Sequence, residues 1–251
     1  LVKYWGKQER SGNLPAIANL SMTLAGLTTT TQVTEAAADT FVLNDATAED
    51  PKLRRWLETL RVSFDIPPLA IHSSNDFPTS AGLASSASGF AALITAINAH
   101  CGLGLDHAMC SEWARVGSAS AARSIFGGFV ALVPPQWWAV PMAKKEHWPL
   151  EVVVAVTSTE AKGVSSGEGM ERSRLTSPYY NAWLRDAAAD FTTASDAISS
   201  KDFAALGTVA ELSCLKMHSV MLTSRPTLSY WTPASITCMD RIRELRAKGN
   251  D

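Results

Sequence analysis

The sequence predicts an α+β fold built from two packed lobes. Strand-like and helical segments alternate over the first half and helices dominate the second, an order that does not match a doubly wound parallel sheet. The length of 251 residues, with 46% hydrophobic and 18% charged residues, suits a globular chain with a sizeable core. The lobes are expected to divide near residues 145–150, which predicts an N-terminal lobe over 1–149 and a C-terminal lobe over 150–251.

Strands are expected where β-branched and apolar residues cluster between turn signals. These segments are residues 26–35, Thr40–Leu43, Leu69–His72, Phe129–Val133 and Glu151–Val156. The last is so rich in valine that it predicts a central strand buried on both faces. Residues 134–149 are rich in Pro and Trp and are predicted to form a loop or an irregular edge.

Helices are expected where apolar residues recur at helical spacing. The predicted helices span 51–63, 83–100, about 107–116 and 233–247; residues 117–124 start another, and 177–222 are mostly helical. The apolar stripes consist of Leu53, Trp56, Leu57 and Leu60 in the first helix and of Ile236, Met239, Ile242 and Leu245 in the last. Gly102 is predicted to end the second helix, and Asp106 to cap the third.

The segment from Pro78 to Gly89 is a loop of small and hydroxylic residues that runs into an apolar helix. Such a loop lets backbone N–H groups approach an anion, and the helix directs the positive end of its dipole there. It is not a Walker A loop, because no Lys-Ser/Thr pair follows the glycine. Ser85 and Ser86 offer hydroxyls for phosphate oxygens or an indirectly held magnesium ion. The alternative is a tight turn in which they only cap a packed helix.

The N-terminal run places two ammonium groups and a phenol close together, at Lys3, Tyr4 and Lys7, with Trp5 between them. These groups are suitable ligands for phosphate or carboxylate. The alternative interpretation is a solvated edge strand whose lysines extend into water.

Two further segments carry possible ligand-binding groups. Ser118, Ser120 and Arg123 lie at a predicted helix start, and a guanidinium suits bidentate capture of a carboxylate or phosphate. The alternative for Arg123 is a surface arginine near a helix cap. Ser165 and Ser166 lie in a Gly/Ser loop after the valine-rich segment, which is typical of a ligand position and also of an ordinary turn.

Other features argue against several classes of protein. The histidines are scattered, and His218 is interpreted as structural because no metal-spaced partner is visible. No metal site is predicted. The net charge of −2 offers no general attraction for nucleic acid or an anionic membrane, and no apolar run of about 18 residues predicts a membrane span. The cysteines show no zinc spacing and favour a reduced, cytoplasmic compartment; they are Cys101, Cys110, Cys214 and Cys238.

Together these segments resemble the GHMP kinases and, within that superfamily, the diphosphomevalonate decarboxylases. The matching motifs follow one another in the family's order from residue 1 to at least residue 245. They are Lys-Tyr-Trp-Gly-Lys at 3–7, Asn-Leu-Pro at 13–15, and the segments 19–24, 75–87, 117–129 and 165–170. The resemblance implies a two-lobed GHMP kinase fold, with a ribosomal protein S5 domain 2-like N-terminal ATP-binding lobe and a ferredoxin-like C-terminal lobe.

The resemblance also implies an activity, the ATP-dependent decarboxylation of mevalonate 5-diphosphate to isopentenyl diphosphate, with ATP and Mg²⁺ as cofactors and a homodimer as the assembly. The implied catalytic residues are Arg123, which would hold the substrate carboxylate, and Lys3. The implied substrate-binding residues are Tyr4, Lys7, Ser118, Ser120, Arg123, Ser165 and Ser166. The implied ATP-binding residues are Pro78, Ser80, Gly82, Leu83, Ala84, Ser85 and Ser86.

One departure from the family pattern concerns its catalytic aspartate, which lies in a Phe-x-Asp-Ala-Gly-Pro type motif near the C-terminus. This sequence holds no such motif, and Asp251 is not assigned the role. The chain starts at Leu1 without an initiator Met and stops in a turn signal, so a longer natural chain is expected; the alternative is a catalytically impaired protein. Two other functions stay open: a GHMP kinase that acts on mevalonate or phosphomevalonate, and a non-catalytic nucleotide-binding relative.

Overall fold

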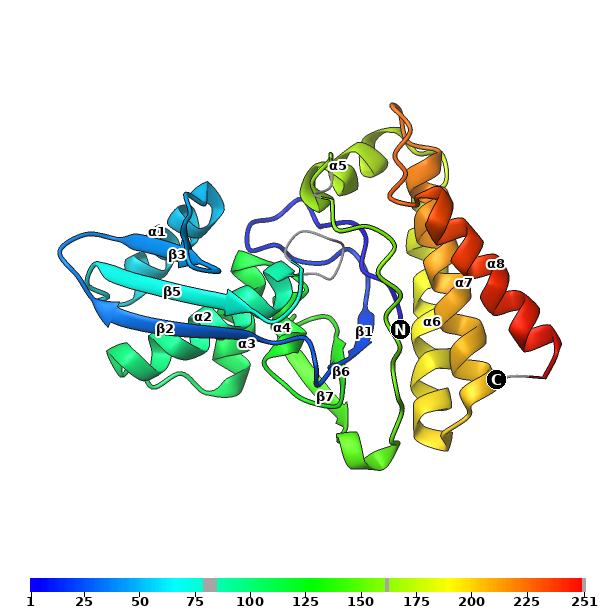
Figure 1. Cartoon of the computed structure of the whole chain (residues 1–251), viewed down its shortest axis with the longest axis horizontal. Helices are drawn as coiled ribbons and strands as arrows, with labels where there is room; N and C mark the ends of the chain where they lie inside the picture. The colour runs from blue at the N-terminus through cyan, green and yellow to red at the C-terminus, as the bar shows by residue number, and fades with distance from the viewer. Residues whose placement is uncertain (79–84, 161–162, 250–251) are drawn as a thin grey trace.

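The computed structural model describes residues 1–78, 85–160 and 163–249. Figure 1 shows a sheet-rich part on one side and a set of long helices on the other. Strands and helices are mixed in the first half and helices follow in the second, which confirms the predicted α+β class. No described helix has the length and hydropathy that a membrane span requires.

The larger sheet has four strands in the order β2-β5-β3-β4. They are β2 (Thr29–Glu35), β3 (Thr40–Leu43), β4 (Ala46–Thr47) and β5 (Leu69–Asn75). β5 pairs antiparallel with β2 and parallel with β3. Asn44 and Asp45 join β3 to β4 with φ angles of 49° and 63°, the left-handed region that suits a two-residue hairpin turn. The predicted strands at 40–43 and 69–72 are confirmed, and the one predicted at 26–35 forms over Thr29–Glu35.

Three helices accompany this sheet: α1 (Pro51–Ser63), α2 (Ser85–Cys101) and α3 (His107–Gly117). Asp50 begins α1, and its carboxylate accepts hydrogen bonds from the backbone N–H groups of Lys52 and Leu53. Asp106 caps α3 as predicted, with a 2.8 Å bond from the backbone N–H of Met109. Gly102 ends α2 in the left-handed conformation, at φ 61°.

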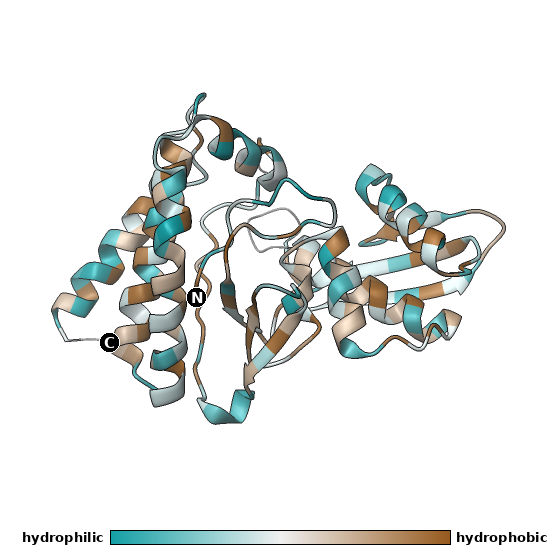
Figure 2. Ribbon diagram, turned by 180° about the vertical axis from the view of Figure 1, so that it is seen from behind, coloured by the Kyte–Doolittle hydropathy of each residue, from teal (hydrophilic) through white to brown (hydrophobic). Residues whose placement is uncertain are grey.

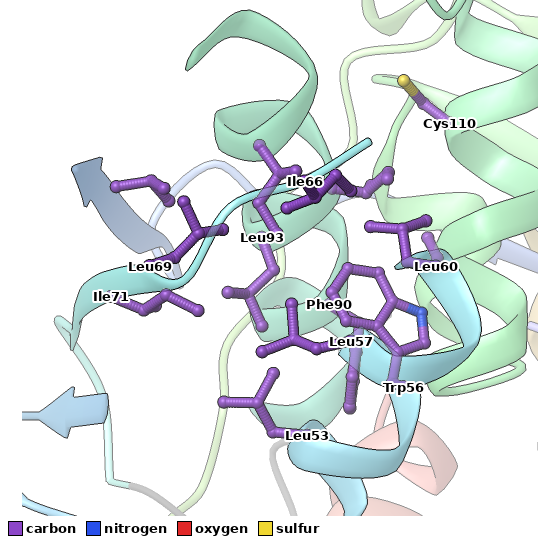
Figure 3. Packing of buried hydrophobic residues seen from close by; sticks show 14 of the residues in the cluster. Leu53, Trp56, Leu57, Leu60, Ile66, Leu69, Ile71, Phe90, Leu93 and Cys110 are labelled. Carbon is purple, nitrogen blue, oxygen red and sulfur yellow. The ribbon is translucent and has the colours of Figure 1, made fainter. Parts of the chain in front are cut away.

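The core of this part is formed by α1, α2, α3 and the buried face of the sheet (Figure 3). All four residues of the predicted α1 stripe are buried. Trp56 meets Phe90 edge to face, with ring centroids 5.4 Å apart. Gly117 lies so close to the Phe90 ring that an added Cβ would approach it to 2.1 Å. This close packing brings the end of α3 against α2.

The second sheet is antiparallel, in the order β1-β6-β7. Its strands are β1 (Asn19–Met22), β6 (Phe129–Leu132) and β7 (Ala139–Ala143); the short helices α4 (Ala121–Ser124) and η1 (Lys145–His147) flank it. β7 lies within 134–149, where a loop or an irregular edge was predicted. β7 is an edge strand, a position at which a proline such as Pro141, which lacks a backbone N–H, is tolerated.

The second half of the chain forms α5 (Ser166–Thr176), α6 (Tyr180–Ser200), α7 (Phe203–Leu222) and α8 (Pro233–Ala247). α6 and α7 pack side by side, and a shared core joins them to the β1–β6 region through residues such as Phe129, Ile198 and Leu206. Lys201 ends α6 in the left-handed conformation and Asp202 caps α7, so two helices divide most of the stretch predicted to be mostly helical over 177–222.

The prediction of a central, buried strand at Glu151–Val156 is wrong. The segment is extended but pairs with no described segment, and Val153 is 95% exposed. β-branched composition favours an extended backbone, whereas burial and a ladder require neighbouring strands that local sequence does not reveal. In the same way α8 forms over its predicted span, yet its stripe is not buried: Ile236 and Ile242 are exposed, and Figure 2 shows apolar residues along this outer helix.

Candidate active site

A cavity of about 1060 Å³ lies where the N-terminal segment, the α3–α4 connection and the second half of the chain meet. Among the described residues that line it, four are cationic and one is acidic. The cations are Lys3, Lys7, Lys52 and Arg123, and the acid is Glu160. Hydroxyl groups from Ser86, Ser118, Ser120, Ser165 and Ser166 also line it. A surplus of positive charge beside hydroxyl donors is the chemistry of a polyanion site.

The N-terminal segment is held against the second half of the chain by its tryptophan. The indole N–H of Trp5 donates to Ser173 Oγ at 3.0 Å, and its carbonyl oxygen accepts from the indole of Trp183 at 2.9 Å. The next residue, Gly6, has a φ of 115°, and an added Cβ would approach the Tyr180 hydroxyl to 2.2 Å. These buried contacts determine where the flanking cations enter the cavity.

Lys3 and Tyr4 lie at the same wall of the cavity. The backbone N–H of Lys3 donates to Ser213 Oγ at 3.1 Å, which ties this segment to α7. The Tyr4 hydroxyl is buried and has no hydrogen-bond partner among the described residues. Burial raises the pKa of Tyr4 well above its usual range, so it is a neutral donor. A buried, unpartnered hydroxyl at a cavity wall is suited to binding a ligand oxygen.

Lys7 is positioned by Asn13, which the sequence analysis did not assign to the site. The Lys7 ammonium donates to Asn13 Oδ1 at 2.7 Å, and the Asn13 amide donates to the carbonyl of Val116 at 2.5 Å. Asn13 adopts a left-handed φ of 53°, a conformation that asparagine tolerates well. Arg115 holds the same loop through the carbonyl of Gly12. Partial burial lowers the pKa of Lys7.

The serines of the small-residue segments meet across the cavity. Ser86 Oγ, at the start of α2, lies 3.2 Å from Ser118 Oγ, and Ser118 Oγ lies 3.4 Å from Ser120 Oγ. The tight approach of α3 to α2 at Gly117 places Ser118 beside α2. Two segments that are 32 residues apart in sequence therefore present one row of hydroxyl groups.

Arg123 projects from α4 into a polar, half-buried environment at the cavity. Its Nε–H donates to Ser21 Oγ at 2.9 Å, and its guanidinium also bonds the side-chain oxygen of Asn19, both residues of β1. Burial lowers the pKa of Arg123 to about 10, with the neighbouring Tyr4 acting in the opposite direction. The side chain therefore stays cationic at neutral pH, and β1 fixes its orientation.

Ser165 and Ser166 bring the start of α5 to the cavity. Ser165 is the N-cap, and its Oγ accepts from the backbone N–H of Glu168 at 3.2 Å. Gly169, one turn into α5, packs so closely on Trp5, Leu228 and Tyr230 that a Cβ would come within about 3 Å of each. The positive end of a helix at this wall adds to the preference for an anion.

Lys52 is a cavity residue that the sequence analysis missed. It lies in the first turn of α1, with its ammonium 4.9 Å from the centre of the Phe90 ring in α2. Desolvation lowers the pKa of Lys52, and the charge of Lys7 acts in the same direction. A lysine near a helix start is an ordinary surface feature in sequence, so only the packing of α1 on α2 could reveal this position.

The predicted ATP-binding residues are only partly within the described structure. Ser80, Gly82, Leu83 and Ala84 lie outside the described residues. Pro78 and Ser85 are described but are not among the described lining residues, whereas Ser86 is. The predicted substrate set lines the cavity throughout, at Tyr4, Lys7, Ser118, Ser120, Arg123, Ser165 and Ser166. Lining residues not predicted include Tyr230 and Trp231, and also His218, which was interpreted as structural.

Known proteins match both halves of the chain. A family described as the diphosphomevalonate decarboxylase-like N-terminal domain matches residues 1–136, and the mevalonate 5-diphosphate decarboxylase C-terminal domain matches residues 152–250. The diphosphomevalonate decarboxylase of Candida albicans is 35% identical over 93% of this chain and 72% of its own length. That of Debaryomyces hansenii is 34% identical over 98% of this chain and 71% of its own length.

Solved structures of similar proteins match the fold of this chain. A structure described as MDDEF in complex with MVAPP, AMPPCP and magnesium superposes with a TM-score of 0.89 and is 37% identical in sequence. The match covers 99% of this chain and 80% of that chain. Mevalonate diphosphate decarboxylase from Staphylococcus aureus is 34% identical with a TM-score of 0.89, covering 99% and 78%. This similarity to solved structures shows that the protein has the GHMP kinase fold. The chain belongs to the diphosphomevalonate decarboxylase family.

Proposed function

We propose that this protein catalyses the ATP-dependent decarboxylation of mevalonate 5-diphosphate to isopentenyl diphosphate. The observation that carries the proposal is a cavity whose described lining residues include four cations, one acid and several serine hydroxyls. Mevalonate 5-diphosphate and ATP both carry phosphate groups, and the former adds a carboxylate. The cavity volume of about 1060 Å³ can hold both ligands together.

The substrate's diphosphate is proposed to bind Tyr4, Lys7 and the serines of the α3–α4 connection, with the start of α5 beside it. The ammonium of Lys7 is oriented by Asn13, and the Tyr4 hydroxyl lacks a partner among the described residues. Arg123 is proposed to hold the carboxylate, because a guanidinium matches two carboxylate oxygens and β1 fixes its plane. Lys3 would then face the reacting carbon from the neighbouring wall.

ATP is proposed to occupy the side of the cavity near Lys52 and Ser86. Among the described residues no three His, Cys, Asp or Glu side chains gather as a metal site. The residues present nevertheless fit Mg²⁺, since this ion usually keeps its waters and is held through substrate phosphates and few protein oxygens. Ser86 and Ser118 supply such oxygens, and the ion would neutralise charge on the transferred phosphoryl group.

The chemistry of the reaction explains the role of each of these side chains. A tertiary hydroxyl leaves poorly, so its conversion to a phosphate ester makes it a good leaving group. When phosphate departs, positive character grows on the tertiary carbon, and the C–C bonding pair of the carboxylate moves in to form the alkene as carbon dioxide leaves. Arg123 orients the carboxylate for this fragmentation, and the lysines stabilise the departing phosphate.

An assay of the purified protein tests the proposal. ATP is supplied with mevalonate, mevalonate 5-phosphate or mevalonate 5-diphosphate, and ADP and carbon dioxide are both measured. The proposal requires equal amounts of ADP and carbon dioxide from mevalonate 5-diphosphate alone. ADP without carbon dioxide would establish a small-molecule kinase, and ATP binding without turnover would establish a non-catalytic relative.

We also propose a cytoplasmic homodimer with lobes over 1–149 and 150–251. All four cysteines are free thiols, which supports a reducing compartment. The gap between the two family matches, from 136 to 152, supports the lobe boundary. Sedimentation velocity tests the dimer, and limited proteolysis near residue 150 tests the boundary.

Tyr4→Phe is expected to weaken substrate binding without lowering the stability of the protein. The KM for mevalonate 5-diphosphate should rise about 3- to 10-fold, as the loss of one hydrogen bond to an anion implies. The melting temperature should stay equal or rise, because the hydroxyl is buried without a protein partner. Steady-state kinetics and a thermal melt check both. An unchanged KM with a lower melting temperature would contradict the assignment.

Lys52→Met is expected to raise the KM for ATP about tenfold or more while leaving the KM for mevalonate 5-diphosphate within about twofold. The variant keeps an apolar stem over Phe90 but removes the ammonium from the cavity. Lys145→Met is the matched control, since Lys145 is 85% exposed and lies outside the described cavity lining. Equal KM values for ATP in the two variants would remove Lys52 from the nucleotide site.

A further inference from the structure

One corner of the cavity is an aromatic pair that the chemistry above does not use. His218, from α7, stacks on Trp231, from the segment between α7 and α8, with ring centroids 4.1 Å apart and planes 23° apart. Both residues line the cavity, and His218 is only 7% exposed. Met217 and Met221, which lie near His218 on α7, also line the cavity.

The imidazole of His218 is held in position by ring stacking, and its ring nitrogens remain available for hydrogen bonds. Among the described residues it makes ring stacking but no hydrogen bond. Burial lowers the pKa of His218 to about 4, and the charge of Lys3 acts in the same direction. The ring is therefore neutral near pH 7, with one N–H donor and one nitrogen acceptor.

Other histidines of this chain show what purely structural roles look like. The Nε2 of His147 is bonded to the carbonyl oxygen of Ile198 at 2.8 Å, which satisfies that nitrogen within the protein. His107 meets Phe126 edge to face at 5.8 Å but is exposed and lies outside the described cavity lining. His218 differs from both, because it is buried, stacked and placed at the wall of a ligand cavity.

We propose that His218, oriented by its stack on Trp231, binds the substrate in this corner through one hydrogen bond to a hydroxyl or phosphoryl oxygen beside Lys3. This inference rests on the proposed function of the cavity. A neutral polar group that is held in a fixed position orients a bound ligand more than it adds affinity by charge. Trp231 is then a positioning residue, which acts through the plane of the imidazole.

Four variants separate hydrogen bonding from packing. His218→Phe keeps a ring that can stack but removes both nitrogens, and His218→Gln keeps a donor and an acceptor without the ring. Trp231→Phe keeps a stacking partner, and Trp231→Leu removes it. His107→Phe is the control for a histidine in contact with an aromatic ring away from the cavity. For each, kcat, the KM and calorimetric Kd for mevalonate 5-diphosphate, and the melting temperature are measured.

His218→Phe is expected to raise the Kd and KM for mevalonate 5-diphosphate about tenfold with little loss of melting temperature, as one missing hydrogen bond to a polar ligand implies. His218→Gln should recover part of this affinity, and Trp231→Leu should weaken binding more than Trp231→Phe. His107→Phe should leave all ligand constants within about twofold.

Two results would overturn the inference: a Kd for His218→Phe equal to that of the wild type, or losses of affinity that follow the melting temperature across all variants. The Kd keeps this test separate from the proposed function. If the wild type binds mevalonate 5-diphosphate but releases no carbon dioxide, the decarboxylase assignment fails while the comparison of Kd values still judges His218.

Discussion

Replacement of Arg123 by Ala is expected to lower kcat/KM for mevalonate 5-diphosphate by about 100-fold or more, as loss of a charged anchor at the reacting group implies. Two of the five guanidinium N–H donors are taken by Ser21 and Asn19, which leaves others for a carboxylate. Because the pKa of Arg123 is about 10, the group is charged throughout the neutral range. The loss should therefore be nearly independent of pH between about 6 and 8.

Two further variants distinguish the effect of the positive charge of Arg123 from that of its planar geometry. Arg123→Lys keeps the charge but not the planar fork, so its loss should be smaller than that of Arg123→Ala and still about tenfold or more. Arg241→Ala is the control, since Arg241 is exposed and pairs with Glu244 on α8 at 2.8 Å. Steady-state kinetics with a thermal melt measure the effect. Near-normal turnover by Arg123→Ala would remove this residue from the active site.

Gly6→Ala is expected to destabilise the protein by about 2–5 kcal/mol and to impair turnover with it. The φ of 115° strains any residue with a Cβ, and the added atom would approach the Tyr180 hydroxyl to 2.2 Å. Relief of this overlap requires the N-terminal segment to move away from α6, which displaces Lys3, Tyr4 and Lys7 together. Urea unfolding gives the stability, and kcat/KM reports the displacement.

A glycine in open space provides the contrast. Gly207 lies inside α7, where an added Cβ meets no atom within 4 Å, so Gly207→Ala should stabilise the protein by about 0.5–1 kcal/mol. Adding Tyr180→Phe to Gly6→Ala should recover part of the lost stability, because the phenol oxygen is the nearest atom and lacks a partner among the described residues. Equal stabilities of Gly6→Ala and the wild type would contradict this account.

Helix positions could be predicted closely because their signals are local. The spans predicted for α1 and α8 match the observed ones, and Asp106 and Gly102 mark the helix ends as expected. Apolar spacing, a cap and a left-handed stop all act within a few residues. Burial does not follow from the same signals, as the exposed stripe of α8 and the exposed valines of the Glu151–Val156 segment demonstrate.

The site could be predicted where its residues occur in recognisable short motifs. Lys3–Lys7, Ser118–Arg123 and Ser165–Ser166 all reach the one cavity, although they come from distant parts of the chain. Lys52 and His218 could not be predicted in the same way. Each is an isolated residue on a long helix, and its role depends on which face of that helix meets the cavity.

The α+β class, the spans of α1 and α8, the family and the residue types that bind anions could be predicted from the sequence alone, because these depend on local spacing and short motifs. The helix α5 was not predicted, since its start has the composition of a Gly/Ser loop. Only the tertiary structure decided which of the anion-binding residues meet. The contacts of Trp5 with Ser173 and Trp183 bring the N-terminal cations to the second half of the chain. The stack of His218 on Trp231 likewise joins a helix to a later loop. Such contacts link residues far apart in sequence, and they depend on packing that no local pattern specifies.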